Sequence, residues 1–231
     1  MGLFKKKEAP QTAPVDLTKK ISLAKEEVAK VCLTKKPLQN LIANVAVALD
    51  YSGSMSGLYS DGTVQNTLEK LLPLAMTFDD NETMEVWRFG NGCKRLNDLT
   101  LNNIEDYLSN ENSNDPNEGT AYASVIKDIV KTYKKNKIPA YIIFITDGDN
   151  FDKEATTEAI KKASEYPIFW QFVGIGNERF NYLQALDDMA GRYVDNADFF
   201  QVKRMDDITY KNLLNEFPNW LANPNVEGML K

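Results

Sequence analysis

Three separate segments of the sequence carry oxygen-bearing side chains that could hold a hard metal ion. Asp50, Ser52 and Ser54 stand at alternate positions in the motif Asp-x-Ser-x-Ser. Asp147 directly follows an apolar run, and Thr120 closes a polar loop just before a helical pattern. Mg²⁺ favours an octahedral set of few carboxylates, neutral oxygens and retained water. These five residues therefore predict a Mg²⁺ site, with Mn²⁺ or Ca²⁺ as alternatives. The bound ion would still attract an anionic oxygen from outside, such as a partner's carboxylate.

The composition excludes several other kinds of chemistry. The 231 residues include no histidine, so neither a Ser-His-Asp nor a Cys-His catalytic group can form. Two cysteines, Cys32 and Cys93, are too few for a Cys-rich zinc site. The N-terminus shows no apolar signal segment, and we therefore expect a cytoplasmic protein with two reduced thiols. No apolar run approaches the length of a membrane-spanning helix.

The elements that must position these residues alternate between strand and helix. Strand patterns cover residues 41–49, 84–89, 93–96, 140–146, 168–175 and 193–202, and helical patterns cover 63–78, 101–108, 121–133, 154–165, 180–189 and 206–221, the last interrupted at Pro218. This alternation predicts a doubly wound α/β fold, with a mostly parallel sheet and helices on both faces. The dipeptide Asn91-Gly92 is typical of a hairpin turn, so we expect one antiparallel strand at the edge of the sheet.

The same fold explains how distant residues could meet. In open α/β sheets, ligands bind beyond the carboxyl ends of the strands. Asp50 and Asp147 each end a buried strand, and the small Gly53 allows a tight turn after the first one. If these two strands are neighbours, both carboxylates lie at one edge of the sheet.

Charge and composition divide the chain into four parts. Residues 1–16 are predicted to be a flexible basic arm, 17–40 an amphipathic lead segment, 41–222 the α/β domain and 223–231 a C-terminal tail. The lead segment has the spacing of a helix ending before Pro37, although its β-prone residues leave a pair of short strands as an alternative. Residues 1–40 carry a local charge of +5 and the remainder −11. An acidic body argues against a nucleic-acid partner.

The motif Asp50-x-Ser52-x-Ser54, together with Thr120 and Asp147, resembles the metal-ion-dependent adhesion site (MIDAS) of von Willebrand factor A (VWA) domains. The resemblance covers residues 41–222 and implies a Rossmann-like VWA fold. Within that family, the stretches 59–65, 71–75, 78–80 and 86–90 resemble the A domains of bacterial or phage tellurium-resistance (Ter-type) and stress-response proteins.

This resemblance implies roles for the individual residues. Ser52 and Ser54 would bind the metal directly, and Thr120 would join when a ligand arrives. Asp50 and Asp147 would act through water. The implied function is a non-enzymatic, Mg²⁺-dependent protein-interaction module, in resistance to tellurium or another toxic anion or in a stress response. In some relatives the last helix, here 206–221, moves on binding.

Two alternatives remain open at this point. Asp50 after an apolar strand resembles the nucleophile of haloacid-dehalogenase-type phosphatases, which would make the chain a metal-dependent phosphohydrolase. Those enzymes place a second Asp where this chain has Ser52, and the phosphate-binding motif Gly-x₄-Gly-Lys-Ser/Thr is missing. The other alternative is a structural domain with a vestigial metal site. Asp61 and Asp149 are interpreted as solvated or turn carboxylates outside the site.

Overall fold

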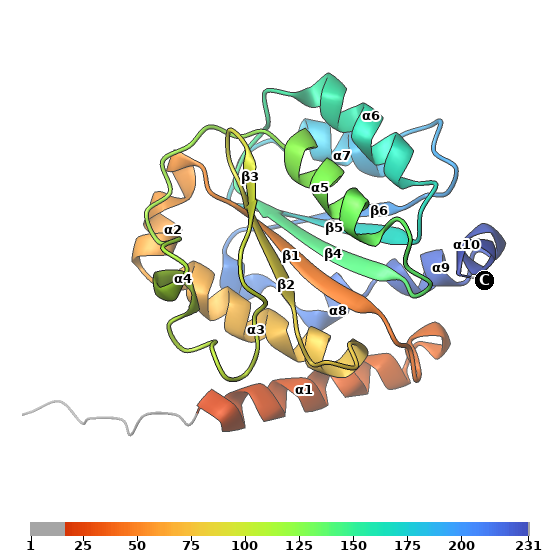
Figure 1. Cartoon of the computed structure of the whole chain (residues 1–231), viewed down its shortest axis with the longest axis horizontal. Coiled ribbons are helices and arrows are strands. Elements are labelled where there is room, and N and C mark those ends of the chain that lie inside the picture. Colours follow the sequence, from red (N-terminus) through yellow and green to blue (C-terminus); the bar gives the residue numbers. More distant parts are fainter. Residues whose placement is uncertain (1–16, 231) are drawn as a thin grey trace, which may run out of the picture.

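The computed structural model describes residues 17–230 and contains one six-stranded sheet in the order β3-β2-β1-β4-β5-β6 (Figure 1). The strands are β1 (Asn44–Asp50), β2 (Glu85–Phe89), β3 (Cys93–Arg95), β4 (Ala140–Thr146), β5 (Ile168–Ile175) and β6 (Ala197–Val202). Only β3 runs antiparallel to its neighbour, and it lies at the edge. The predicted doubly wound, mostly parallel sheet with one antiparallel edge strand is confirmed.

Helices cover both faces of this sheet. The α-helices are α1 (Leu17–Leu33), α2 (Ser56–Ser60), α3 (Thr63–Phe78), α4 (Tyr107–Asn110), α5 (Ala123–Tyr133), α6 (Lys153–Ala163), α7 (Asn181–Asp187), α8 (Tyr210–Leu213), α9 (Phe217–Leu221) and α10 (Pro224–Met229). Within residues 17–230 there are also three short 3₁₀ helices, η1 (Lys36–Leu38), η2 (Gly53–Met55) and η3 (Met205–Asp207). In Figure 1, α5, α6 and α7 lie on one side of the sheet and α1, α3 and α8 on the other.

Strand β1 shows why the sheet is buried on both faces. Val45, Val47 and Leu49 pack into the core beneath α1 and α3. Ala46 and Ala48 face the second core, beneath α5 and α6. A strand covered on both sides by crossover helices needs apolar residues facing both layers, and residues 45–49 of β1 are all apolar.

The lead segment forms a helix that packs on α3. Ile21, Val28 and Cys32 of α1 are buried on one side of the helix, as its three- and four-residue spacing predicts. The alternative of two short strands is therefore wrong. The basic arm predicted for residues 1–16 lies outside the described residues.

The last predicted helix, 206–221, is expected to be interrupted at Pro218, but its breaks lie elsewhere and Pro218 lies inside a helix. The segment instead forms η3, α8 and α9, and α9 begins at Phe217 with Pro218 in its first turn. Proline lacks the amide hydrogen that a helix interior requires but is tolerated in a first turn. The chain therefore restarts a helix at this point, and α10 follows as a further short helix.

Two other predicted elements are shorter in the structure. Most of the predicted helix 101–108 is turn, because the Asn103 side chain accepts a hydrogen bond from Thr100 N at 2.7 Å and donates one to Asp98 O at 2.9 Å. Such local bonds compete with helix formation. The predicted strand 193–202 begins only at Ala197, because the preceding segment is a loop held by the Arg192 guanidinium, which donates to Met189 O at 3.0 Å.

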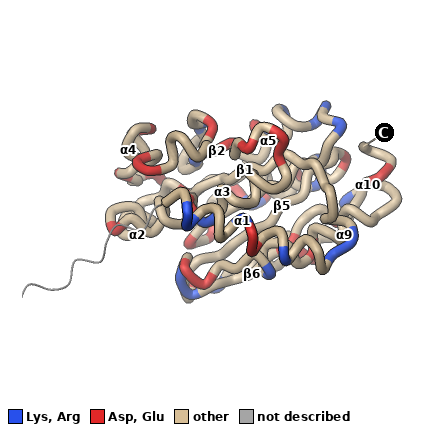
Figure 2. Tube along the Cα trace, turned by 90° about the horizontal axis from the view of Figure 1, so that it is seen from below, with Lys and Arg blue, Asp and Glu red and all other residues tan. Residues whose placement is uncertain are grey.

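No helix within residues 17–230 combines the length and apolar character needed to cross a membrane. Figure 2 shows acidic and basic residues interspersed along the described chain. Many of the ion pairs they form are local, such as the one between Lys162 and Glu165 on either side of the end of α6.

Candidate metal centre

Four of the five predicted site residues form one connected group at the end of β1. Asp50 is the last residue of the strand and is fully buried, and its Oδ1 accepts a hydrogen bond from Ser52 N at 2.8 Å. The hydroxyls of Ser52 and Ser54 lie 3.1 Å apart. Ser54 Oγ then donates to Asp147 Oδ1 at 2.8 Å. Ser52 is buried while Ser54 is exposed, so the group extends from the sheet to the surface.

The pairing of β1 with β4 brings the two carboxylates together. These strands are parallel, with Leu49 opposite Ile145. The next residue on β4, Thr146, donates its hydroxyl proton to Asp50 Oδ2 at 2.5 Å. Thr146 is not among the residues predicted from the sequence, and its position at the end of a buried strand next to Asp147 is the one signal that points to it.

Thr120 lies at the same edge, between the loops that follow β1 and β4. Gly53 N donates to Glu118 O at 3.0 Å, and Phe151 N donates to Thr120 O at 3.1 Å. The segment around Thr120 is therefore bonded to both loops. Within residues 17–230 the Thr120 hydroxyl has no hydrogen-bond partner, which leaves it available to a ligand.

A carboxylate outside the predicted set fixes this segment. Asp152 accepts hydrogen bonds from Tyr122 N at 3.0 Å and Ala123 N at 2.8 Å, at the start of α5. Burial alone would raise the pKa of Asp152, but these bonds and those from Asn150 and Thr156 outweigh it and hold the pKa below its usual value. Asp152 thus connects the β4 loop to the helix that follows Thr120.

Aromatic residues support the end of β1 from the other side. The Tyr59 hydroxyl donates to Asp50 O at 3.0 Å. The rings of Tyr51 and Tyr59 meet edge to face with centroids 5.6 Å apart, and the Arg88 guanidinium lies 4.1 Å from the Tyr51 ring centroid. This packing holds the backbone of Asp50 in place.

The electrostatics of the group favour a bound cation. Burial raises the pKa of Asp50 to about 6, against the effect of its bonds with Thr146 and Ser52, and the charge of Asp147 adds to the rise. Burial also raises the pKa of Asp147, to which the charge of Glu178 contributes. A divalent ion between the two carboxylates would offset this cost.

The donor set also fits a small hard ion by its spacing. Neighbouring ligand oxygens of an Mg²⁺ octahedron lie about 3.0 Å apart, given metal–oxygen distances of about 2.1 Å. The oxygens of Ser52 and Ser54 are 3.1 Å apart, and those of Ser54 and Asp147 are 2.8 Å apart. In the described part of the chain, no group of three or more Cys, Asp or Glu side chains could hold a metal.

The two carboxylates interpreted as lying outside the site have other partners. Asp61 accepts a hydrogen bond from Thr63 N at 2.9 Å, next to the start of α3. Asp149 pairs with Lys153 at 2.5 Å.

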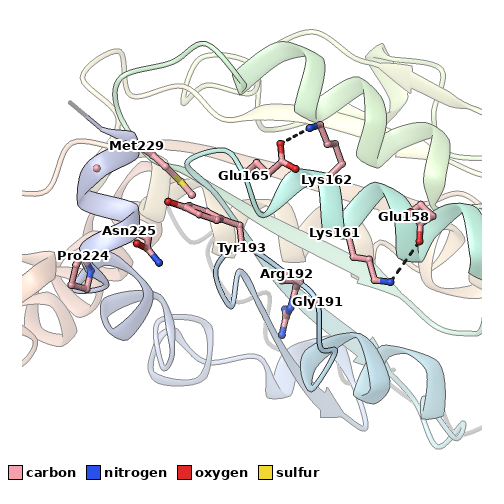
Figure 3. Close-up of a pocket in the computed structure, with 11 residues that line it drawn as sticks. Glu158, Lys161, Lys162, Glu165, Gly191, Arg192, Tyr193, Pro224, Asn225 and Met229 are labelled. Carbon is pink, nitrogen blue, oxygen red and sulfur yellow. Dashed lines mark hydrogen bonds and ion pairs between the residues drawn. The ribbon is translucent and has the colours of Figure 1, made fainter.

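A groove of about 980 Å³ lies near the opposite edge of the sheet, between the end of α6, the loop before β6 and α10 (Figure 3). Lys161 is paired with Glu158 and Lys162 with Glu165 along one wall. None of the five predicted site residues lines it.

Comparisons with known proteins agree with this architecture. A model of the vWA domain found in the TerF C terminus (vWA-TerF-like) matches residues 42–230. The chain is 37% identical over 222 residues to the uncharacterized protein YcbR of Bacillus subtilis strain 168, covering 91% of this chain and 90% of YcbR.

Solved structures show the same fold at low identity. The SpRpn10 VWA domain has a TM-score of 0.56 at 14% identity, covering 81% of this chain and 98% of that domain. Proximal thread matrix protein 1 from the mussel byssus, solved with a zinc-occupied MIDAS motif, has a TM-score of 0.54 at 16% identity, covering 79% of this chain and 48% of that protein. The family resemblance inferred from the sequence is confirmed, and the chain belongs to the vWA-TerF-like family.

Proposed function

We propose that this chain is a Mg²⁺-dependent protein-interaction module that binds an Asp or Glu carboxylate of a partner. The metal would be held by Asp50, Ser52, Ser54, Thr120 and Asp147. The observation that carries this proposal is the continuous contact from Ser52 through Ser54 to Asp147, beside the buried Asp50.

Each residue has a distinct part in the proposal. Ser52 and Ser54 supply neutral oxygens, and the charges of Asp50 and Asp147 balance a divalent ion. Thr120, whose hydroxyl is free of other partners among the described residues, joins when the partner binds. The bound ion supplies a positive centre that accepts an oxygen of the partner's carboxylate. Mn²⁺ and Ca²⁺ are the alternatives, and the zinc in the mussel protein's MIDAS motif supports a divalent cation in general.

Binding is favoured over catalysis by the side chains at the site. The chain has no histidine, and Ser52 stands where a phosphohydrolase of the type considered above needs a second Asp. Ser52 is a hydroxyl within the hydrogen-bonded group, so it is suited to hold an ion rather than to donate a proton to a leaving group.

Isothermal titration calorimetry with MgCl₂ tests the metal site. We expect the wild type to bind Mg²⁺ and Asp50→Ala and Ser54→Ala to lose measurable binding. Asp149→Asn and Ser60→Ala are matched controls, because Asp149 is paired with Lys153 and the Ser60 hydroxyl donates to Gly57 O. Equal Mg²⁺ binding by the wild type and Asp50→Ala would end the proposal.

The biological setting that we propose is resistance to tellurium or another toxic anion, or a stress response. It is supported by membership of the family named for the TerF C terminus. We expect a host that lacks the gene to regain growth on tellurite with the wild-type gene but not with Asp50→Ala. Capture of a partner from that host should require Mg²⁺ and fail in EDTA. Equal growth with both genes would remove tellurium from the proposal.

A further inference from the structure

An exposed aromatic residue stands beside the candidate metal centre. Phe151 is 70% exposed, and its backbone N–H donates to Thr120 O at 3.1 Å. A Cβ added at Gly119 would lie 3.5 Å from Phe151 Cε1. The ring is therefore placed against the short segment that carries the Thr120 hydroxyl.

The residues next to Phe151 are held by hydrogen bonds, so the conformation of the loop keeps the Phe151 ring exposed. Asn150 is buried, and its Nδ2 donates to Asp152 Oδ1 at 2.6 Å and to Thr156 Oγ1 at 2.9 Å. Asp152 in turn holds the start of α5. Asn150 and Asp152, on the two sides of Phe151, are both held by hydrogen bonds, so Phe151 presents its ring to solvent from a rigid support. Exposed aromatic rings on rigid supports are well suited to anchor a partner.

The ring also forms one side of a shallow depression next to the site. The depression has a volume of about 420 Å³ and is lined by Phe151, Asp152, Lys153, Glu154, Ala155 and Glu158. The single basic group in this lining, Lys153, is paired with Asp149. An apolar side chain can rest on Phe151 and Ala155 here, whereas a second carboxylate would be repelled by the acidic residues around it.

We propose that Phe151 and this depression select the partner by the side chains next to its metal-bound carboxylate. The partner presents one isolated Asp or Glu, with an aromatic or large aliphatic residue within a few positions that packs on the Phe151 ring. A run of acidic residues is disfavoured. This inference rests on the proposed function, because the carboxylate needs the metal.

Selection from a random peptide library displayed on phage tests the inference. The library is bound to the wild-type protein in MgCl₂ and eluted with EDTA. We expect the eluted peptides to be enriched in a single acidic residue with an apolar neighbour. Selection on Phe151→Ala should keep the acidic residue and lose the apolar one, and selection on Asp50→Ala should show no enrichment over the starting library.

The affinity of each protein variant for the most enriched peptide, made synthetically, tests the inference quantitatively. Phe151→Ala should bind it about tenfold more weakly in fluorescence anisotropy, and Phe151→Tyr should retain the wild-type affinity. Leu33→Ala is the matched control, since Leu33 is 71% exposed at the far end of α1. Calorimetry should give Phe151→Ala and the wild type the same Mg²⁺ affinity, because the ring supplies no ligand.

The outcomes separate the two proposals. Acidic peptides without an apolar neighbour, or an unchanged affinity in Phe151→Ala, would overturn the role of Phe151 and leave metal-dependent binding intact. If EDTA released no enriched peptides, or if the enriched peptides bound equally well to Asp50→Ala, the proposed function would be overturned together with this inference.

Discussion

The Thr146 hydroxyl donates to Asp50 Oδ2 at 2.5 Å, although the two residues are 96 positions apart. Thr146 in turn accepts a hydrogen bond from the Tyr122 hydroxyl at 3.1 Å. Both oxygens of Asp50 are thus engaged, Oδ1 by Ser52 N and Oδ2 by Thr146. The direction of a carboxylate that two hydrogen bonds hold is fixed before any ligand binds.

Replacing Thr146 by Val should therefore weaken metal binding without removing a ligand. Loss of a partner that orients a ligand typically costs about 10–100-fold in metal affinity, and we expect a loss in this range by calorimetry with MgCl₂. Thr146→Ser retains the hydroxyl and should bind Mg²⁺ close to the wild-type level. Similar affinities for the wild type and Thr146→Val would show that the bond does not position Asp50.

The sequence predicted the parts of the site that depend on local spacing. Asp50, Ser52 and Ser54 are recognisable because alternate positions around one turn share a side of the chain. Thr146 and Asp152 were missed because their partners, Asp50 and the start of α5, become neighbours only through strand pairing and loop packing. Asp147 and Thr120 were recognisable because one directly follows an apolar run and the other closes a polar loop before a helical pattern, whereas no such local signal marks Asp152.

The fold was predictable where it depends on local sequence patterns. The prediction failed where tertiary contacts decide the structure, in the helices after β6. Residues 140–145 of β4 are all apolar or aromatic because both faces of the strand are covered, and that pattern is local. After β6, short helices pack individually onto the core through residues such as Leu213 and Phe217. Their breaks depend on tertiary contacts and on Pro218, and a helical period alone does not locate them.

Magnesium should stabilise the folded protein by mass action. A ligand that binds only the folded state at about 100 times its Kd adds about 2.7 kcal/mol, which corresponds to a rise in Tm of about 5–10 °C for a chain of this size. We expect this rise in a thermal-shift experiment with MgCl₂ and its reversal by EDTA. Asp50→Ala should show no rise, while Asp149→Asn should respond like the wild type. A Tm independent of Mg²⁺ in the wild type would contradict the metal site.

Asp187 should make the protein less stable as the pH rises. Burial raises its pKa to about 6, the charges of Asp198, Asp195 and Asp188 add to the rise, and Arg192 opposes it. Because the folded pKa lies above the unfolded value of about 3.9, the favourable contribution of Asp187 is present in acid and lost as the pH rises toward and through 6.

The variant Asp187→Asn tests this contribution. It should increase the free energy of unfolding at pH 7.5 by on the order of 1 kcal/mol. This is less than the full pKa shift would give, because Asp187 is only half-buried and solvent screens its charge. At pH 4 urea unfolding should give nearly equal stabilities for the variant and the wild type. Exposed Asp188→Asn is the matched control and should have the smaller effect. A constant difference at both pH values would mean that ionisation of Asp187 is not the cause.

Asp152 should show the opposite dependence on pH. Its bonds to Tyr122 N and Ala123 N lower its pKa in the folded state, so its contribution to stability is present above the unfolded pKa of about 3.9 and is lost as the pH falls through the lower folded value. Asp152→Asn can accept only one of the two backbone bonds and leaves a buried N–H unpaired. We expect a loss of about 1–3 kcal/mol at pH 7, measured by urea unfolding, and a smaller difference at pH 3.

Amide hydrogen exchange at Tyr122 and Ala123 should also accelerate in the Asp152→Asn variant, because the lost bonds fix the start of α5 and hence the segment that carries Thr120. If the stability falls but exchange at these amides stays at the wild-type rate, Asp152 does not hold that segment in place.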